Sequence, residues 1–256
     1  MWPEPYWFWP HFMFQKSSSL FLSILFLFTI HGCSGRSSIS NHSEIVYPDW
    51  FWQPPTNFLS AVGYARTYYD RQSSIDVATE NAIEQLARQL QVNISSEIIA
   101  MNDQQAEKFR ETISEGLCQR IAKSHYVLNT FVTSKLTLVL ISEQERSISD
   151  KITPVSKNEP DWLYQIPNEN GYEYGVGSSN LTYFPETAWQ KAEKRAIIDL
   201  AANLHSKIGS VNSYSKTYHQ NISSSKTKIQ LQNVLVIARW FSIQDGSYHV
   251  LVRMTK

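Results

Sequence analysis

The residues that could carry catalytic or metal chemistry are few and dispersed. The seven histidines are scattered along the chain, and two of them, His11 and His31, fall in an apolar N-terminal segment. No HExxH, CxxC, GxSxG, P-loop or dinucleotide-binding GxGxxG motif is present, and these are the spacings that assemble metal ligands, redox thiols, nucleophiles and phosphate-binding amides. We therefore predict no catalytic residue, no metal ligand and no cofactor, and a protein that is not an enzyme.

Two acidic residues and one glycine-rich triplet have a structural interpretation. Asp49 and Asp161 each follow a proline and precede a tryptophan, which favours a turn or Asx-cap over acid-base catalysis. Gly175-Val176-Gly177 ends a predicted strand but lacks the third glycine and the lysine of a phosphate loop. We interpret the triplet as a place where a helix closely approaches the strand.

Aromatic residues are the strongest candidates for binding a partner. Trp50 and Trp52 lie beside Tyr47 and Phe51, and Trp162 follows the second Pro-Asp pair. Such rings could bind a glycan, a peptide or a protein. The alternative is that they cover the open end of a sheet at the start of each copy of a repeat, a packing role that their matching positions favour.

Cys33 is the predicted site of covalent modification. It ends an apolar run from Leu20 to Ile30 of about eleven residues, too short to span a bilayer but suitable for the apolar part of a signal peptide. Ile30-His31-Gly32-Cys33 resembles the bacterial lipobox, from which it departs at His31. The motif implies a diacylglycerol on the Cys33 thiol, cleavage before it and anchoring by the acyl chains. An uncleaved membrane anchor with an unmodified Cys33 is the alternative.

The start of the chain is unusual for a signal peptide, because Glu4 and three prolines stand where a short positive segment is expected. A start at Met13 would give a typical signal with Lys16 as its charge. We predict a signal peptide over 1–32, with translation from Met13, and a lipidated, Ser- and Asn-containing tether over 33–47.

Charge and cysteine content narrow the function classes. The chain has 23 basic and 23 acidic residues among 256, and the removal of 1–32 takes away one Glu and one Lys, so the mature chain offers no basic excess for nucleic acid. Cys118 is the second of the two cysteines. If Cys33 is acylated, Cys118 has no partner within the chain, so we predict an inert buried thiol, with intermolecular pairing as the alternative.

A repeat with a spacing of about 114 residues organises the rest of the chain. Identical residues recur from Val62-Gly63 and Val176-Gly177 to Ser96 and Ser210. They follow the apolar stripe of a helix, which we expect to be capped by Ser73 with Asp76 in the first copy and to begin at Pro185 in the second. The small residues on each stripe predict close packing on a sheet.

The remaining elements follow from apolar spacing and turn residues. A second helix is expected over Ala106 to Lys123 of the first copy, and Asp245-Gly246 marks a hairpin turn. The Ser-rich segment 217–228 is expected to be a loop. The predicted strands are Phe58 to Ala65, Val92 to Ala100, Tyr126 to Ser142 as more than one strand, Tyr172 to Ser178, Ile208 to Tyr214, Ile229 to Phe241 and Tyr248 to Met254. This order favours an α/β (α+β) fold of two tandem modules, each a long helix on a curved, mainly antiparallel sheet.

The Pro-Asp-Trp openings, the helix motif with Ala78, Asn81, Ala82, Leu86 and Ala87, and the closing segment DGSYHVLVRM together resemble the LPP-twenty family of bacterial membrane-associated lipoproteins, a domain similar to those of flagellar outer-membrane lipoproteins. The likeness extends over two copies, 48–150 and 160–256, joined by a linker over 151–159. It implies no established catalytic activity. Arg195 stands where the family's Asn is expected in the second copy, so no binding role is carried over to that position.

From this resemblance and Cys33 we expect a lipoprotein of the Gram-negative outer membrane, on its periplasmic or surface face. Its partners would be outer-membrane lipid, envelope or flagellar proteins, or a second copy of itself. The expected function is that of a non-enzymatic structural or adaptor component. The alternative is a glycan- or peptide-binding lipoprotein that uses Trp50, Trp52 and Trp162, and it predicts a concave pocket lined by these rings.

Overall fold

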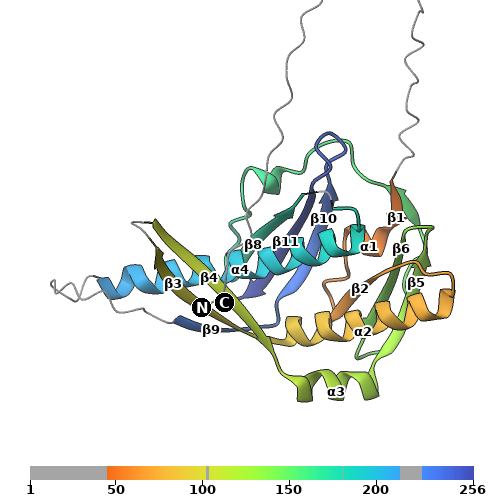
Figure 1. The fold of residues 1–256 in the computed structure, drawn as a ribbon, viewed down its shortest axis with the longest axis horizontal. Helices are drawn as coiled ribbons and strands as arrows, with labels where there is room; N and C mark the ends of the chain where they lie inside the picture. The colour runs from red at the N-terminus through yellow and green to blue at the C-terminus, as the bar shows by residue number, and fades with distance from the viewer. Residues whose placement is uncertain (1–44, 102–103, 181, 214–226) are drawn as a thin grey trace, which may run out of the picture. The chain divides into compact units, whose positions relative to one another are not determined.

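The computed structural model describes residues 45–256, apart from 102–103, 181 and 214–226 (Figure 1). The predicted signal peptide, Cys33 and the tether up to residue 44 lie outside the described residues, as does most of the Ser-rich segment 217–228.

Among the helices of the described residues, none combines the length and the apolar character needed to cross a membrane.

Both copies of the repeat lie in one compact unit, Ser43–Lys256. The elements of the first copy and the residues just before it are β1 (Val46–Pro48), α1 (Asp49–Trp52), β2 (Ser60–Arg66), α2 (Arg71–Leu90), β3 (Gln91–Met101), β4 (Gln104–Ile113), α3 (Glu115–Ser124), β5 (Tyr126–Val132) and β6 (Leu136–Ser142). The linker and the second copy contain β7 (Ile152–Pro154), the 3-10 turn η1 (Asp161–Leu163), β8 (Tyr172–Ser179), α4 (Pro185–Ser213), β9 (Thr227–Gln232), β10 (Leu235–Phe241) and β11 (Tyr248–Thr255).

Every strand pair in these residues is antiparallel, and the strands form sheets in the orders β2-β6-β5, β10-β11-β8, β4-β3-β9 and β1-β7. Helix α2 packs on β2 and β6, and α4 packs on β8 and β11 (Figure 1). The predicted α+β class, with a long helix on an antiparallel sheet in each copy, is confirmed.

Glycines at equivalent positions allow each helix to lie directly on its sheet. A Cβ added at Gly63 would stand 1.8 Å from the carbonyl oxygen of Ala78, and one added at Gly177 would stand 2.0 Å from that of Ala192. Gly175 is equally close to the backbone of α4, with the Ala196 oxygen 2.2 Å from the added atom. The interpretation of the Gly175–Gly177 triplet as a close helix approach is therefore confirmed.

At equivalent residues of the edge strands β2 and β8, a free backbone group is hydrogen-bonded by a side chain of the long helix, but the side chain differs between the copies. The Tyr64 backbone N–H donates to Asn81 Oδ1 at 2.9 Å, whereas Arg195 Nη1 donates to the Ser178 carbonyl oxygen at 2.5 Å. The bonded groups are the N–H of residue 64 and the C=O of residue 178, both on the free edge of their strands. An acceptor side chain can satisfy the first and a donor side chain the second. The substitution of Asn by Arg at the equivalent helix position keeps this function.

Strands β2 and β6 of the sheet β2-β6-β5 are buried on both faces, whereas β5 is partly exposed. Ala61 and Ala65 of β2 pack against the stripe of α2, while Val62 and Tyr64 belong to a core that includes Trp189 and other residues of the second copy. Alternate residues of a strand point to opposite faces, which is why β6 is apolar along most of its length. The first sheet thus lies between its own helix and the second copy.

The two copies also share a sheet. Strand β9 of the second copy pairs with β3 of the first, with Val92 opposite Leu231 and Ile94 opposite Ile229 (Figure 1). The Glu111 carboxylate of β4 accepts from Arg88 of α2 and lies 3.6 Å from the Lys194 ammonium of α4. In the residues described, the copies are therefore joined by backbone pairing, apolar packing and charge.

The predicted helix over Ala106 to Lys123 is wrong in its first half. Residues 104–113 form β4, which pairs with β3 from Met101↔Gln104 to Val92↔Ile113, and α3 begins only at Glu115. Phe109 and Ile113 are four residues apart, a spacing that places two side chains on one face of either a helix or a strand. The spacing alone could not separate the two, and the pairing partner decided it.

The predicted strand over Ile208 to Tyr214 is also wrong, because α4 continues to Ser213. Leu204, Ile208 and Val211 continue the three- and four-residue apolar spacing of this helix. The other predicted strands agree with the structure to within a few residues, with breaks between β5 and β6 and between β9 and β10. Gly246 has a φ of 69°, as the predicted turn at Asp245-Gly246 requires.

The predicted cap of α2 is wrong by one helical turn. Asp70, not Ser73, is the N-cap residue, and its carboxylate accepts from the backbone N–H groups of Gln72 and Ser73. Asp76 accepts from the Gln72 side chain at 2.7 Å instead of completing a capping box. Hydrogen bonds to Asp70 from the Ser73 hydroxyl, and then from the backbone N–H groups of Ser73 and Gln72, hold the pKa of Asp70 below its usual value. The predicted start of α4 at Pro185, with Glu186 in the first turn, is confirmed.

The close helix packing predicts that Gly177→Ala lowers the free energy of unfolding by about 3 kcal/mol, because the added methyl group meets the α4 backbone and not a movable side chain. Urea unfolding of the full-length protein in detergent measures the change. Gly116→Ala is the control: the nearest atom to its added Cβ is Ser114 Oγ at 3.9 Å, so stability should stay the same or rise by up to about 1 kcal/mol. Equal unfolding midpoints for Gly177→Ala and the wild type would contradict the packing.

Candidate functional site

A pocket of about 680 Å³ brings together the three tryptophans that the sequence singles out. Trp50 and Trp52 come from α1, Trp162 from η1, and Trp240 of β10 joins them. We call this site the tryptophan pocket. Its rings come from both copies of the repeat, so the pocket exists only because the copies are packed together.

The three predicted rings differ in burial. Trp50 and Trp52 are 3% and 8% exposed and belong to the apolar core, while Trp162 is half-buried and packs against that core. Phe51 lies between them in the sequence and makes edge-to-face contacts with Trp52 and Trp189, with ring centroids 5.1 Å apart in both pairs. The rings therefore pack as well as line the pocket.

The linker forms one wall of the pocket. The Trp52 Nε1–H donates to the Thr153 carbonyl oxygen at 3.1 Å, and the Trp240 Nε1–H donates to that of Ser156 at 2.9 Å. Strand β7 of the linker also pairs with β1. Two indoles are thus fixed in orientation by backbone carbonyls of the segment that joins the copies.

Asp49 bonds to this wall through both its side chain and its backbone. Its carboxylate accepts from the Thr153 hydroxyl and lies 3.5 Å from the Lys151 ammonium, and its backbone N–H donates to the Lys151 carbonyl oxygen at 2.8 Å. The predicted cap is wrong, because Pro48 is the N-cap residue of α1. The predicted turn at Asp49 is confirmed, since its carbonyl accepts from the Gln53 N–H at 2.9 Å. The predicted turn at Asp161 is confirmed, since its carbonyl accepts from the N–H groups of Tyr164 and Gln165.

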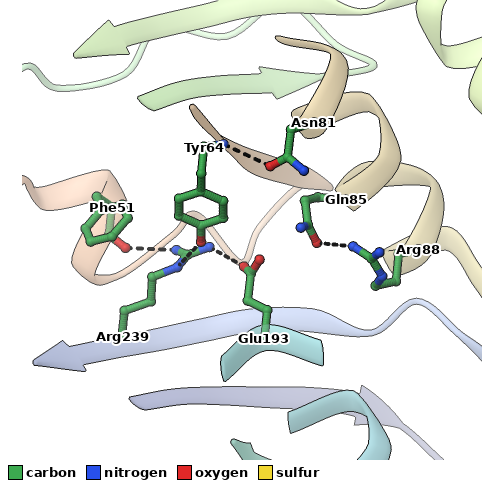
Figure 2. Close-up of polar contacts among 7 residues, drawn as sticks. All are labelled: Phe51, Tyr64, Asn81, Gln85, Arg88, Glu193 and Arg239. Atoms are coloured by element: carbon green, nitrogen blue, oxygen red, sulfur yellow. Dashed lines mark hydrogen bonds and ion pairs between the residues drawn. The ribbon is translucent and has the colours of Figure 1, made fainter. Parts of the chain in front are cut away.

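Arg239, one of the residues that line the pocket, forms a buried ion pair with Glu193 (Figure 2). The Arg239 guanidinium donates to Glu193 Oε1 at 2.6 Å, to the Tyr64 hydroxyl at 2.8 Å and to the Phe51 carbonyl oxygen at 2.8 Å. The Arg239 and Glu193 side chains are 0% and 2% exposed. Because Arg239 and Glu193 belong to the second copy and Tyr64 and Phe51 to the first, one guanidinium bonds both copies.

The electrostatics of this cluster favour a charged guanidinium. Burial by itself lowers the pKa of Arg239, but Tyr64 and Glu193 more than offset it, so that the pKa is raised. Burial raises the pKa of the Tyr64 phenol well above its usual value, so its hydroxyl stays protonated. This cluster was not predicted from the sequence, although the lone arginine within the apolar strand LVIARWF indicates that a buried partner exists.

A second series of side-chain hydrogen bonds, also not predicted from the sequence, orders the turn between β10 and β11. His249 Nδ1 lies 2.8 Å from Ser178 Oγ, His249 Nε2 lies 2.6 Å from Ser247 Oγ, and Ser247 Oγ donates to Asp245 at 2.7 Å. Burial lowers the pKa of His249, and hydrogen bonds from Ser242 and Ser247 lower that of Asp245 to about 2. Both ring nitrogens face serine hydroxyls, and the carboxylate bonds a serine instead of the ring. We therefore assign these residues a structural role in holding the turn between β10 and β11.

Cys118 is a half-buried free thiol that packs against the core of the first copy, and burial raises its pKa, which disfavours the reactive thiolate. Within the part of the chain that the structure describes, no group of three or more His, Cys, Asp and Glu side chains is placed to hold a metal ion.

The buried ion pair predicts that Glu193→Gln lowers the free energy of unfolding by about 3 kcal/mol, because the Arg239 charge then remains buried without its counter-charge. Glu143→Gln provides the matched control. Glu143 pairs with Arg120 at 3.4 Å, with side chains 33% and 61% exposed, and its loss should change stability by less than about 1 kcal/mol. Equal effects of the two substitutions in urea unfolding would show that the Arg239 cluster contributes no more than a surface pair.

Comparisons of the chain with protein-family models, with curated proteins and with solved structures found no match. The resemblance to the LPP-twenty family therefore stays a prediction from the sequence.

Proposed function

We propose that this chain is a lipid-anchored, non-enzymatic protein of the bacterial outer membrane that binds a ligand in the tryptophan pocket. The observation that carries the proposal is the convergence of Trp50, Trp52 and Trp162 on one concave site. The sequence analysis named these three residues as binding candidates and named such a pocket as the feature expected of a binding lipoprotein. At about 680 Å³ the pocket lies within the usual range of ligand sites.

The anchor rests on Cys33 and its lipobox-like surroundings. Eleven residues, 34–44, separate Cys33 from the first described residue, Ile45, and a chain of that length would reach about 40 Å if fully extended. A tether of this length would allow the pocket to reach ligands near the membrane while the acyl chains stay in the bilayer.

An adaptor role is the second candidate function, and the sheet β4-β3-β9 favours it. In the described part of the chain, β4 and β9 are the outer strands of this sheet. The outer edge of such a strand carries backbone N–H and C=O groups that can pair with a strand of another protein. Envelope or flagellar proteins, or a second copy of this chain, are the partners that this edge would suit.

The anchor is tested by lipid labelling. Cells that express the full chain are fed an alkyne-bearing palmitate, and we expect the label on the wild-type protein and its loss in Cys33→Ala. Cys118→Ala is the matched control, because it removes the only other cysteine and should keep both the label and membrane attachment. A label that persists in Cys33→Ala, or that disappears in Cys118→Ala, would contradict lipidation at Cys33.

Ligand binding is tested with isolated peptidoglycan sacculi, an envelope polymer that offers both glycan strands and peptides. The full-length protein in detergent should sediment with sacculi, and Trp162→Ala should weaken the association about tenfold, which corresponds to about 1.4 kcal/mol. Tyr164→Ala is the control, since Tyr164 lies on the same turn but is 78% exposed and outside the pocket. The same affinity for all three proteins would argue against the pocket as the binding site.

A further inference from the structure

We infer that the ligand of the tryptophan pocket is an uncharged oligosaccharide of pyranose sugars. The inference rests on the proposed binding function and names the chemical class that the site suits.

The aromatic lining suits the face of a sugar ring. The π-face of an indole carries partial negative charge, and one face of a pyranose presents C–H groups of opposite polarity. Four tryptophans from three elements, α1, η1 and β10, line this one site. Three of them, Trp50, Trp52 and Trp240, are less than 10% exposed, so the half-buried Trp162 presents most of the open ring surface. A flat ring with polar groups at its rim can lie against such a surface while its hydroxyl groups remain at the edges of the aromatic rings.

The charges that line the pocket are already paired. The Asp49 carboxylate lies 3.5 Å from the Lys151 ammonium, and the Arg239 guanidinium is bonded to Glu193. The other polar residues that line the site carry amide or hydroxyl groups, among them Gln53, Asn57, Ser147 and Ser149. A charged ligand would lose water here and find no free counter-charge, which costs free energy. Neutral hydroxyl groups can instead form hydrogen bonds with the amide and serine side chains.

Part of the linker backbone is already bonded within the protein. One edge of β7 is paired with β1. The carbonyls of Lys151, Thr153 and Ser156 accept from Asp49, Trp52 and Trp240. A peptide that adds a strand could not use these groups, whereas a ligand that bonds through side chains does not need them.

The test uses tri-N-acetylchitotriose as the probe and the full-length protein in detergent. Isothermal titration should show saturable binding that Trp162→Ala weakens at least about tenfold, while Trp162→Phe, which keeps a ring face, loses less than about threefold. Tyr164→Ala should bind as the wild type does. An increase in salt from about 50 to 500 mM should change the affinity less than about twofold, as expected for a neutral ligand.

A further variant keeps the test decisive if Trp162→Ala fails to fold. Asn57 is exposed at the rim of the pocket, so Asn57→Ala should leave the unfolding midpoint unchanged and still weaken chitotriose binding about threefold or more. Chitotriose binding that neither Trp162→Ala nor Asn57→Ala weakens would overturn the saccharide assignment to this pocket.

The outcomes separate this inference from the proposed function. Sacculus binding that depends on Trp162 but is competed by the free stem peptide, with no binding of chitotriose, would overturn the saccharide class and leave a binding protein in place. The loss of both sacculus and chitotriose binding, with a folded wild-type protein, would remove the proposed function itself.

Discussion

The burial of one guanidinium constrains the arrangement of the two copies of the repeat. An ion taken out of water is destabilising unless its hydrogen-bonding groups find partners, and Arg239 finds them in Glu193, Tyr64 and the Phe51 carbonyl (Figure 2). Those partners stand on α4, β2 and α1. A displacement of any one of these elements would leave the charge without a bond, so the cluster favours a single arrangement of the copies. The Phe51 bond also fixes the backbone of α1, whose Trp50 and Trp52 form part of the pocket lining.

The repeat shows which features the packing requires and which it allows to change. Both copies keep a glycine beneath two alanines of the long helix, because any side chain there would meet the helix backbone. At the edge of each sheet the requirement is only for a hydrogen-bonding partner, which Asn81 provides as an acceptor and Arg195 as a donor. The strands after the helix differ more, because β9 pairs with β3 of the other copy. The copies have thus diverged where they pair with each other.

The sequence predicts the features that depend on local spacing. The stripes of α2 and α4, the start of α4 at Pro185 and the turn at Gly246 follow from residues close in the chain. Local spacing fails where two structures share it: Phe109 and Ile113 suit a helix or a strand, and the pairing of β4 with β3 over residues 104–113 decides for the strand. It also cannot reveal partners that are distant in sequence. Arg239 and Tyr64 are 175 residues apart, and no pattern in either strand names the other.

The same limit applies to the tryptophan pocket, and it explains why the linker matters to the site. The sequence identifies Trp50, Trp52 and Trp162 as exceptional, but their meeting point depends on the segment between the copies. The carbonyls of Thr153 and Ser156 fix two indole rings before any ligand arrives. Rings that are already immobile lose little conformational entropy on binding, which leaves more of the contact energy for affinity. A ligand in the pocket would contact α1, the linker and β10 together, and would therefore stabilise the packing of the copies that forms the site.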